Sequence, residues 1–354
     1  VSAYETRASS IPWNFSPVLD LGLDPRFPRQ FESFGEDPLL VKTFGEAMIR
    51  GYQGDSNQVH NKTKIAACMK HFIGYHATIS GKDRTPSYIP DHVLSEYHIP
   101  SFKAAIDAGA KTIMINSGII NGIPVHSSYK ILTDLLRNQL GFEGVILTDW
   151  EDINKLHDRD KIVSSKKEAI RLAINAGIDM SMVPYEYEEF IDNLMELVNE
   201  GKVTMDRIDE AVSKILKLKF ELDLFENPST SPSDYNDFAS EEFQGMAYQS
   251  AAEAITLLKN NDNILPFERD KKILVVGPNA DNMRCLNGAW TYSWQGELTD
   301  KFAGDFNTIF EALANKYGKD NVKYVSGVSY KENGSYYDMV EDDILKKVGK
   351  QLIL

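Results

Sequence analysis

The chain has 354 residues, 42% hydrophobic and 25% charged, a composition typical of a globular protein with room for two domains. Its net charge is −14 at pH 7 and no segment gathers Lys and Arg, which argues against nucleic acid as a partner. Two cysteines cannot form a disulfide framework, and no apolar stretch reaches the roughly 18 residues of a membrane span.

Short apolar runs alternate with amphipathic stretches over the first two thirds of the chain. This alternation predicts a parallel sheet that is covered by helices. The expected strands are residues 12–20, 64–72, 111–117, 144–149 and 178–184. The expected helices are residues 37–51, 93–108, 127–140, 165–176, 186–200 and 204–222. Glycines precede three of the strands, where helix C-caps belong: Gly109, Gly141 and Gly177.

Five strands are too few to close a barrel, so residues 1–222 are predicted to be part of a (β/α)8 barrel whose first strands precede residue 1. The Pro-, Ser- and Asp-rich segment 223–240 is predicted to be a linker. Residues 241–354 are expected to form the first part of an α/β sandwich domain, with a helix at 241–259 and a strand at 272–277. The last four residues resemble the start of another strand.

Charged side chains stand at the ends of two predicted strands, where barrel enzymes carry their chemistry. Asp149 is followed by Trp150, and a carboxylate beside an aromatic ring suits attack on a sugar whose C–H face packs on the ring. The alternative is that Asp149 caps the following helix. Lys70 and His71 could donate hydrogen bonds to sugar hydroxyls, or be a strand-end lysine and a satisfied core histidine.

Three further features allow two interpretations each. Arg29, in a loop rich in charge, is either a substrate clamp or part of an internal ion-pair network, and Arg84 has the same alternatives. The aromatic segment that begins at Trp290 suits carbohydrate stacking, or is a small hydrophobic cluster.

No metal or organic cofactor is predicted. His92, Glu96 and His98 lack the spacing of a zinc protease motif and are expected on a solvated helix face. Gly277 follows a predicted strand, but its surroundings do not form a glycine-rich phosphate loop.

Seven segments in this order resemble the family 3 glycoside hydrolases, in particular β-glucosidases of the Bacteroidetes type. They are residues 15–20 (FSPVLD), 24–29 (DPRFPR), 32–38 (ESFGEDP), 70–72 (KHF), 121–126 (NGIPVH), 141–150 (GFEGVILTDW) and 290–296 (WTYSWQG). Each segment alone is weak, but the ordered set covers nearly the whole chain and is specific.

The resemblance implies an exo-acting enzyme that removes a non-reducing terminal β-D-glucose with retention of configuration. Asp149 matches the nucleophile, and Trp150 and Trp290 match the two aromatics that enclose the next sugar. The residues that match groups facing the terminal sugar are Arg29, Lys70, His71 and, in part of the family, Arg84. Many members have a Tyr where this chain has Ser117. A β-glucoside substrate, no metal or cofactor, and a periplasmic or extracellular location are implied as well.

The resemblance also places the general acid/base glutamate beyond Leu354, so this chain alone is expected to hydrolyse glycosides poorly or not at all. Within the family, β-N-acetylhexosaminidase activity ranks lower, because residues 73–81 contain no Asp-x-His pair. β-Xylosidase activity stays open. A third alternative is a non-catalytic carbohydrate-binding barrel.

Overall fold

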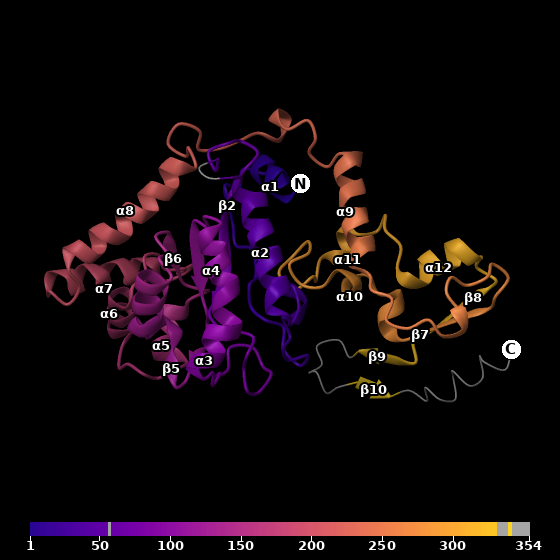
Figure 1. Ribbon diagram of the computed structural model, residues 1–354, viewed down its shortest axis with the longest axis horizontal. Helices are drawn as coiled ribbons and strands as arrows, with labels where there is room; N and C mark the ends of the chain where they lie inside the picture. Colours follow the sequence, from indigo (N-terminus) through magenta and orange to yellow (C-terminus); the bar gives the residue numbers. More distant parts are fainter. Residues whose placement is uncertain (56–57, 331–338, 342–354) are drawn as a thin grey trace. The chain divides into compact units, whose positions relative to one another are not determined.

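The computed structural model describes residues 1–55, 58–330 and 339–341. The chain divides into two compact units, Val1–Glu253 and Ala254–Leu354, and each is described by itself (Figure 1). None of the helices in the described residues is long and apolar enough to cross a bilayer.

The first unit is built on a four-stranded parallel sheet in the order β1-β2-β3-β6. The strands are β1 (Trp13–Asn14), β2 (Ala66–Phe72), β3 (Thr112–Ile115) and β6 (Val145–Leu147). Almost every residue of β2, β3 and β6 is buried, which is the pattern of strands covered on both faces. The alternation of strands and helices that the sequence predicts is therefore confirmed.

Two predicted strands are shorter than expected. The run 12–20 pairs regularly only in β1, because Pro17 has no N–H to donate, and resumes as a single bridge from Val18 to Lys70. The run 178–184 is reduced to one bridge between Leu147 and Met180. Backbone bonds persist there, from the Met180 N–H to the Ile146 carbonyl and from the Thr148 N–H to the Met180 carbonyl, both at 3.1 Å. The Asp179 carboxylate adds a side-chain bond by accepting the N–H of Ile146 at 2.9 Å.

The helices of the first unit follow the predicted segments closely, and polar N-caps begin several of them. Asp37, Ser165 and Thr204 each accept a backbone N–H of the first turn of the helix that follows. The helices are α1 (Ser2–Ala8), α2 (Pro38–Gln53), α3 (Asp91–Val93), α4 (Ile99–Asp107), α5 (Asp152–Asp158), α6 (Lys166–Ala176), α7 (Tyr187–Asn199), α8 (Met205–Glu221) and α9 (Glu241–Ala254).

Several short or irregular elements complete this unit. Two predicted helices contain π-helical stretches, η2 (Leu94–His98) and η4 (Lys130–Gln139). The first lies just before Pro100, which has no N–H for a regular helical bond. The others are the hairpin β4 (Ile119–Ile120) and β5 (Ile123–Pro124), and the 3-10 turns η1 (Gln30–Glu32), η3 (Val125–Ser127) and η5 (Pro232–Asp234).

The core of the first unit lies between the sheet and the helices around it. Phe72 of β2 meets Phe102 of α4 edge to face at 5.1 Å, and Ile113 and Ile146 are fully buried beside them. Cys68 is buried in β2. Helix α2 packs beside α4, and α6 packs against both α5 and α7 (Figure 1).

The polar segment 223–240 lies against the N-terminal helix α1. The Thr230 hydroxyl donates to the carbonyl of Arg7 at 2.5 Å, and the Tyr235 ring meets Tyr4 edge to face at 5.0 Å. Tyr235 also donates from its hydroxyl to the carbonyl of Lys62. These contacts hold the segment on the surface of the first unit.

The second unit contains two small sheets. Strand β7 (Ile273–Val276) runs parallel to β8 (Val322–Val325), and β9 (Val328–Tyr330) pairs antiparallel with β10 (Met339–Glu341). Val275, Ala314 and Val322 form its small buried core. Its helices are α10 (Met283–Asn287), α11 (Thr299–Phe302) and α12 (Ile309–Tyr317), with 3-10 turns η6 (Asn261–Asn263) and η7 (Pro278–Asp281).

Two expectations concern the edges of this region. The helix predicted at 241–259 ends at Ala254, just before the β-branched pair Ile255 and Thr256. The strand start expected at 351–354 lies outside the described residues.

Candidate active site

Charged residues gather at the carboxyl ends of β2 and β6. Asp149 stands two residues after β6 ends, and Lys70 and His71 lie in the last residues of β2. Because parallel strands end at the same edge, their side chains share one region of the molecule. Although burial opposes the shift, the charge of Asp149 raises the pKa of Arg84, and the hydrogen bond to Glu32, with Asp149 as a minor contributor, raises that of Arg29. The structure thus brings six of the predicted site residues to one edge, since Trp150 directly follows Asp149.

Asp149 offers one oriented oxygen and one unoccupied oxygen. Its Oδ1 accepts the backbone N–H of Trp150 at 2.6 Å. Its buried Oδ2 has no hydrogen-bond partner among the described residues and lies 3.6 Å from Nη2 of Arg84. Helix α5 begins only at Asp152, after Glu151 in the N-cap position, so the capping interpretation of Asp149 does not describe this geometry.

Trp150 projects beside this carboxylate. Its side chain is 43% exposed and meets Tyr185 edge to face at 6.0 Å. Two hydrogen bonds fix the turn that carries Trp150. The Lys155 ammonium donates to the Trp150 carbonyl, and Glu151 donates its N–H to the carbonyl of Met182 at 2.9 Å. The exposed ring therefore sits on a fixed turn.

Arg29 is held by a carboxylate, a phenol and an imidazole. Its Nε and Nη2 donate to the two oxygens of Glu32 at 2.7 and 2.8 Å. Its Nη1 donates to the Tyr75 hydroxyl at 3.2 Å, and its Nη2 also lies 3.2 Å from Nε2 of His71. The side chain is 15% exposed. Arg29 is thus part of an internal ion-pair network and still reaches the surface of the site.

His71 and Lys70 are both held in environments that disfavour positive charge. Burial, with the charges of Arg29 and Lys70, lowers the pKa of His71 well below 6.5. Burial and Arg29 also lower the pKa of Lys70. His71 is only 1% exposed, so it is a neutral, interior imidazole.

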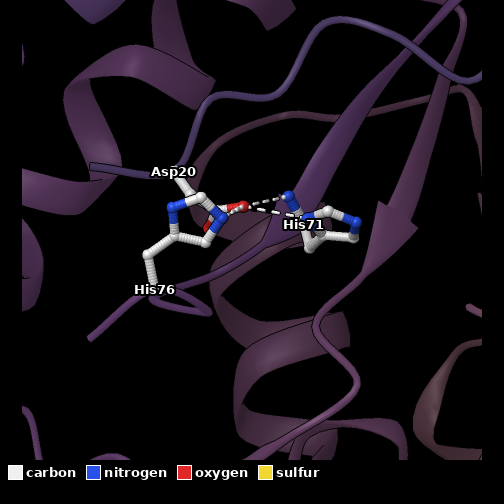
Figure 2. A group of neighbouring side chains, drawn as sticks. All are labelled: Asp20, His71 and His76. Atoms are coloured by element: carbon white, nitrogen blue, oxygen red, sulfur yellow. Dashed lines mark hydrogen bonds and ion pairs between the residues drawn. The ribbon is translucent and has the colours of Figure 1, made fainter. Parts of the chain in front are cut away.

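Asp20 belongs to the same edge but was not predicted as a site residue. Its Oδ2 accepts the backbone N–H of His71 at 2.9 Å and lies 3.0 Å from His71 Nδ1 (Figure 2). Its Oδ1 accepts the N–H of Tyr75 at 3.2 Å. Burial raises the pKa of Asp20 to about 7. The signal was present in the sequence, because Asp20 ends the run 12–20 as Asp149 ends the run 144–149.

Asp20, His71 and His76 are the one group in the described residues whose ligand atoms lie close enough to hold a metal ion, within 4.8 Å of one another (Figure 2). The carboxylate of Asp20 already accepts two backbone N–H groups and lies 3.0 Å from Nδ1 of His71, and the Arg29 cation contacts His71. These existing contacts favour a hydrogen-bonded group of side chains over a bound metal ion. His76 lies 3.8 Å from Asp20, and burial lowers its pKa to about 3.

The metal alternative that the sequence raised for His92, Glu96 and His98 fails for a different reason. His92 and Glu96 are exposed, but His98 is buried, and burial lowers its pKa to about 4. The expectation that all three lie on a solvated face is therefore wrong for His98. The π-helical stretch that ends at His98 places it on the core side of its helix.

A second buried carboxylate, Asp152, lies behind Asp149 and was also not predicted. Asp152 accepts a hydrogen bond from the Ser117 hydroxyl at 2.8 Å and pairs with Lys155 at 3.0 Å. His126 and Arg159 lie 3.6 and 4.0 Å from its oxygens. Ser117, at the position where many family members have Tyr, therefore anchors the turn after the candidate nucleophile.

The two remaining predicted site residues are Arg84 and Trp290. Arg84 has a left-handed backbone (φ 58°), and its Nε is buried without a hydrogen-bond partner in the described chain. Trp290 lies in the second unit and is 58% exposed, next to the exposed Tyr292 and Trp294. Tyr292 stacks on Phe302 at 5.6 Å. A sugar-binding role for Trp290 stays a prediction.

The fold and this edge define an α/β protein with a parallel sheet, at whose carboxyl edge lie buried charges, a carboxylate oxygen without a hydrogen-bond partner in the described residues, and an exposed indole. Comparison with known proteins identifies its family. Residues 1–218 match the model of the glycosyl hydrolase family 3 N-terminal domain, and residues 255–351 match that of the family 3 C-terminal domain. The chain belongs to glycosyl hydrolase family 3.

Individual relatives agree with this membership. The chain is 43% identical to a lysosomal beta glucosidase of Dictyostelium discoideum over 92% of its own length and 41% of that protein. It is 33% identical to a periplasmic beta-glucosidase of Salmonella typhimurium, over 82% of the chain and 38% of that protein. A beta-glucosidase of Listeria innocua, solved with glucose, superposes with a TM-score of 0.82 at 32% identity, over 94% of this chain and 44% of that one.

The chain thus spans less than half the length of each of these relatives. The match to the N-terminal family domain and to the solved structure confirms the predicted fold class, a parallel (β/α) barrel architecture followed by a second α/β unit.

Proposed function

We propose that the protein of which this chain is part is a retaining glycoside hydrolase that removes non-reducing terminal β-D-glucose, with Asp149 as the nucleophile. The observation that carries this proposal is the pair of unlike oxygens on Asp149. One is fixed by the Trp150 N–H, and the other is buried, unpartnered and 3.6 Å from a guanidinium. A ligand that brings an electrophilic carbon to this point meets an oriented carboxylate. The beta-glucosidases among the relatives support glucose as the sugar.

In the first step, Asp149 Oδ2 forms a bond to the anomeric carbon while the bond from that carbon to the leaving oxygen breaks. The leaving oxygen takes a proton from a general acid. Water then attacks the same carbon, the bond to Asp149 breaks, and a proton returns from water to the acid/base group. The glutamate predicted to supply this proton lies beyond Leu354, outside the described residues.

The remaining site residues receive binding roles in this proposal. Arg29 and Lys70 present cations to the hydroxyls of the terminal sugar, and Arg84 stabilises the charge of Asp149 between turnovers. His71 belongs to the same hydroxyl-binding edge. The exposed ring of Trp150 packs on the next sugar, and Trp290 is proposed as its partner on the opposite face. No step requires a metal or an organic cofactor.

The periplasmic beta-glucosidase among the relatives supports an exported protein. We accordingly propose a periplasmic or extracellular location. Detection of the protein only in the soluble fraction of lysed spheroplasts, after release of the periplasm, would contradict this.

Covalent trapping tests the proposal. In the longer protein that contains this chain, a 2-fluoro glucoside with a good leaving group should add one glycosyl mass to the wild type and none to Asp149→Asn. Asp158→Asn, an exposed carboxylate on the following helix, is the matched control and should label fully. Undiminished labelling of Asp149→Asn removes this residue from the role.

Three further measurements test the sugar preference, the alternative of a non-catalytic barrel, and the activity of this chain alone. Rates on aryl glucoside, xyloside and N-acetylglucosaminide should favour the glucoside, and a faster xyloside would replace glucose by xylose. Sugar binding without turnover in the longer protein would support a non-catalytic barrel. The 354-residue chain itself should turn over the aryl glucoside slowly or not at all, because retention needs two carboxyl groups and the family resemblance predicts the second one outside this chain.

A further inference from the structure

The hydrogen bonds around His71 define its tautomer. A guanidinium has only donors and stays protonated, so in the 3.2 Å contact between Arg29 Nη2 and His71 Nε2 the imidazole nitrogen must accept. A neutral imidazole with an accepting Nε2 carries its proton on Nδ1. Nδ1 lies 3.0 Å from Oδ2 of Asp20. An ionised carboxylate has no proton to donate, so Oδ2 accepts this hydrogen bond. The two contacts therefore agree on a single form, with the proton on Nδ1.

Asp20 is built to hold this form. It is fully buried at the end of the first strand run, and two backbone N–H groups, of His71 and Tyr75, donate to its two oxygens. These bonds leave no rotational freedom to the carboxylate. In Figure 2 it faces the ring of His71 on one side and that of His76 on the other.

Beyond His71 the chain of contacts continues to the surface of the site. Arg29 is gripped by Glu32 from one side and by Tyr75 and His71 from the other. These contacts occupy four of its five N–H groups, and one N–H on Nη1 has no protein partner among the described residues. His71 is 1% exposed, whereas Arg29 reaches solvent, so a ligand meets the guanidinium before it meets the imidazole.

We propose that Asp20 and His71 are positioning residues: Asp20 holds His71 as the Nδ1–H tautomer, and the accepting Nε2 aims the Arg29 guanidinium at a hydroxyl of the bound sugar. The sugar in this statement rests on the proposed function, whereas the tautomer and the aim of Arg29 do not. The low pKa of His71 agrees with a ring that stays neutral.

Two substitutions at Asp20 separate positioning from mere support of the fold. Asp20→Ala removes the acceptor for Nδ1–H, whereas Asp20→Asn can turn its amide oxygen toward His71 and keep it. Asp179→Ala is the matched control, because Asp179 is an equally buried carboxylate that accepts a backbone N–H and pairs with Arg137 and Arg207 instead. It should cost stability without acting on His71.

The readouts are the ¹⁵N signals of the His71 ring and of Arg29 Nε in ¹⁵N-labelled protein, and the affinity for the imino sugar isofagomine. The wild type should show the Nδ1–H form. Asp20→Ala should lose it, shift the Arg29 signal and bind isofagomine at least about tenfold more weakly, because a misaimed charged donor forfeits one such hydrogen bond. Asp20→Asn and Asp179→Ala should keep both signals and most of the affinity.

Coupling to Arg29 provides a second test. In an Arg29→Lys background, Asp20→Ala should cost far less affinity than in the wild type, because the guanidinium that Asp20 and His71 position is no longer present. Equal losses in both backgrounds overturn the proposal. If Asp20→Ala does not fold, His71→Phe replaces it, since it removes the accepting nitrogen and keeps a ring; unchanged Arg29 signals in that variant overturn the proposal as well.

Three other outcomes would also support or overturn the proposal. A wild type with the proton on Nε2 refutes the tautomer. Loss of the wild-type His71 signals with EDTA, restored by Zn²⁺, would instead make Asp20, His71 and His76 a metal site. A wild type that binds no sugar but shows the Nδ1–H form, with an Arg29 signal that depends on Asp20, contradicts the proposed function and leaves the positioning of Arg29 supported.

Discussion

The two ends of the parallel sheet treat buried charge in opposite ways. Near the start of β6, Asp179 pairs with Arg137 at 2.5 Å and Arg207 at 2.9 Å and accepts the N–H of Ile146. Near the end of β6, Asp149 and Asp152 each have an oxygen without a hydrogen-bond partner among the described residues; Arg84 and His126, respectively, lie 3.6 Å from these oxygens. Both ends belong to one unit and one sheet, so the difference does not come from the fold as a whole.

The comparison separates two uses of a buried carboxylate. A fully paired group contributes to stability when it is present and leaves uncompensated charges when it is removed. A buried polar atom without a partner costs free energy, and folded proteins keep few of them outside functional sites. The unpaired end is the end at which α/β barrels carry their chemistry.

Acidification should have the largest effect on stability, and it acts mainly at the unpaired end. Burial lowers the pKa values of His71, His76, His98 and His126, so each contributes stability that is present above its unfolded pKa of about 6.5 and is lost as pH falls. Asp20, with a raised pKa, acts in the opposite direction between about pH 4 and 7. Because four histidines act against one aspartate, unfolding should take up protons on balance, and the free energy of unfolding should fall from pH 7 to pH 5.

Thermal and urea unfolding across this pH range measure the effect. A free energy of unfolding that stays constant from pH 7 to pH 5 would show that the buried histidines titrate normally. His98→Phe, on the core face of its helix and away from the site edge, should flatten the profile by about 1.4 kcal/mol per pH unit below pH 6.5.

Asp179→Ala should cost about 3–5 kcal/mol, because it leaves Arg137 and Arg207 buried without their anion. Urea unfolding checks this value. Asp107→Ala is the control: its ion pair with Lys103 is exposed, and its removal should change stability by less than about 0.5 kcal/mol. Loss of sugar affinity in folded Asp179→Ala would contradict the division between the two ends.

Asp149→Asn, in contrast to Asp179→Ala, should affect activity without lowering stability. Because Oδ2 of Asp149 has no hydrogen-bond partner in the part of the chain that the structure describes, replacing the charge should leave stability unchanged or raise it by about 1 kcal/mol, while covalent labelling is lost. Differential scanning calorimetry of the variant and the wild type measures the first effect. A destabilisation of 3 kcal/mol or more would place Asp149 with Asp179 among the structural carboxylates.

Trp290→Ala should have the smallest effect on stability, within about 0.5 kcal/mol, because the indole is 58% exposed. If the ring contacts the second sugar, the variant should lose affinity for a disaccharide and keep its affinity for a monosaccharide, measured by calorimetric titration. Leu313→Ala, in a residue packed on the core of the same unit, is the control for a loss of stability without loss of affinity. Equal affinities for both sugars would remove Trp290 from the site.

Much of the fold follows from sequence patterns that act locally. Apolar runs of strand length and polar helix caps predicted β2, β3 and β6 and the longer helices of the first unit, since both depend on residues a few positions apart. The short helices α1 and α5 and those of the second unit were not predicted. The same rule placed Asp149, Lys70 and His71 at strand ends. It failed at residues 178–184, where the strand is reduced to a single bridge between Met180 and Leu147, and at His98, which is buried at the end of a π-helical stretch.

The sequence alone therefore determined the alternation of strands and helices and the edge at which charge collects. Only the tertiary structure decided what each charge contacts. Asp20 meets His71 across 51 residues of sequence and Arg29 meets it across 42, and neither separation has a local signature. Such partners are set by how helices and loops pack on the sheet, because a hydrogen bond needs atoms placed to within a few tenths of an ångström. That placement made Asp20 the centre of the site edge and His71 an interior group.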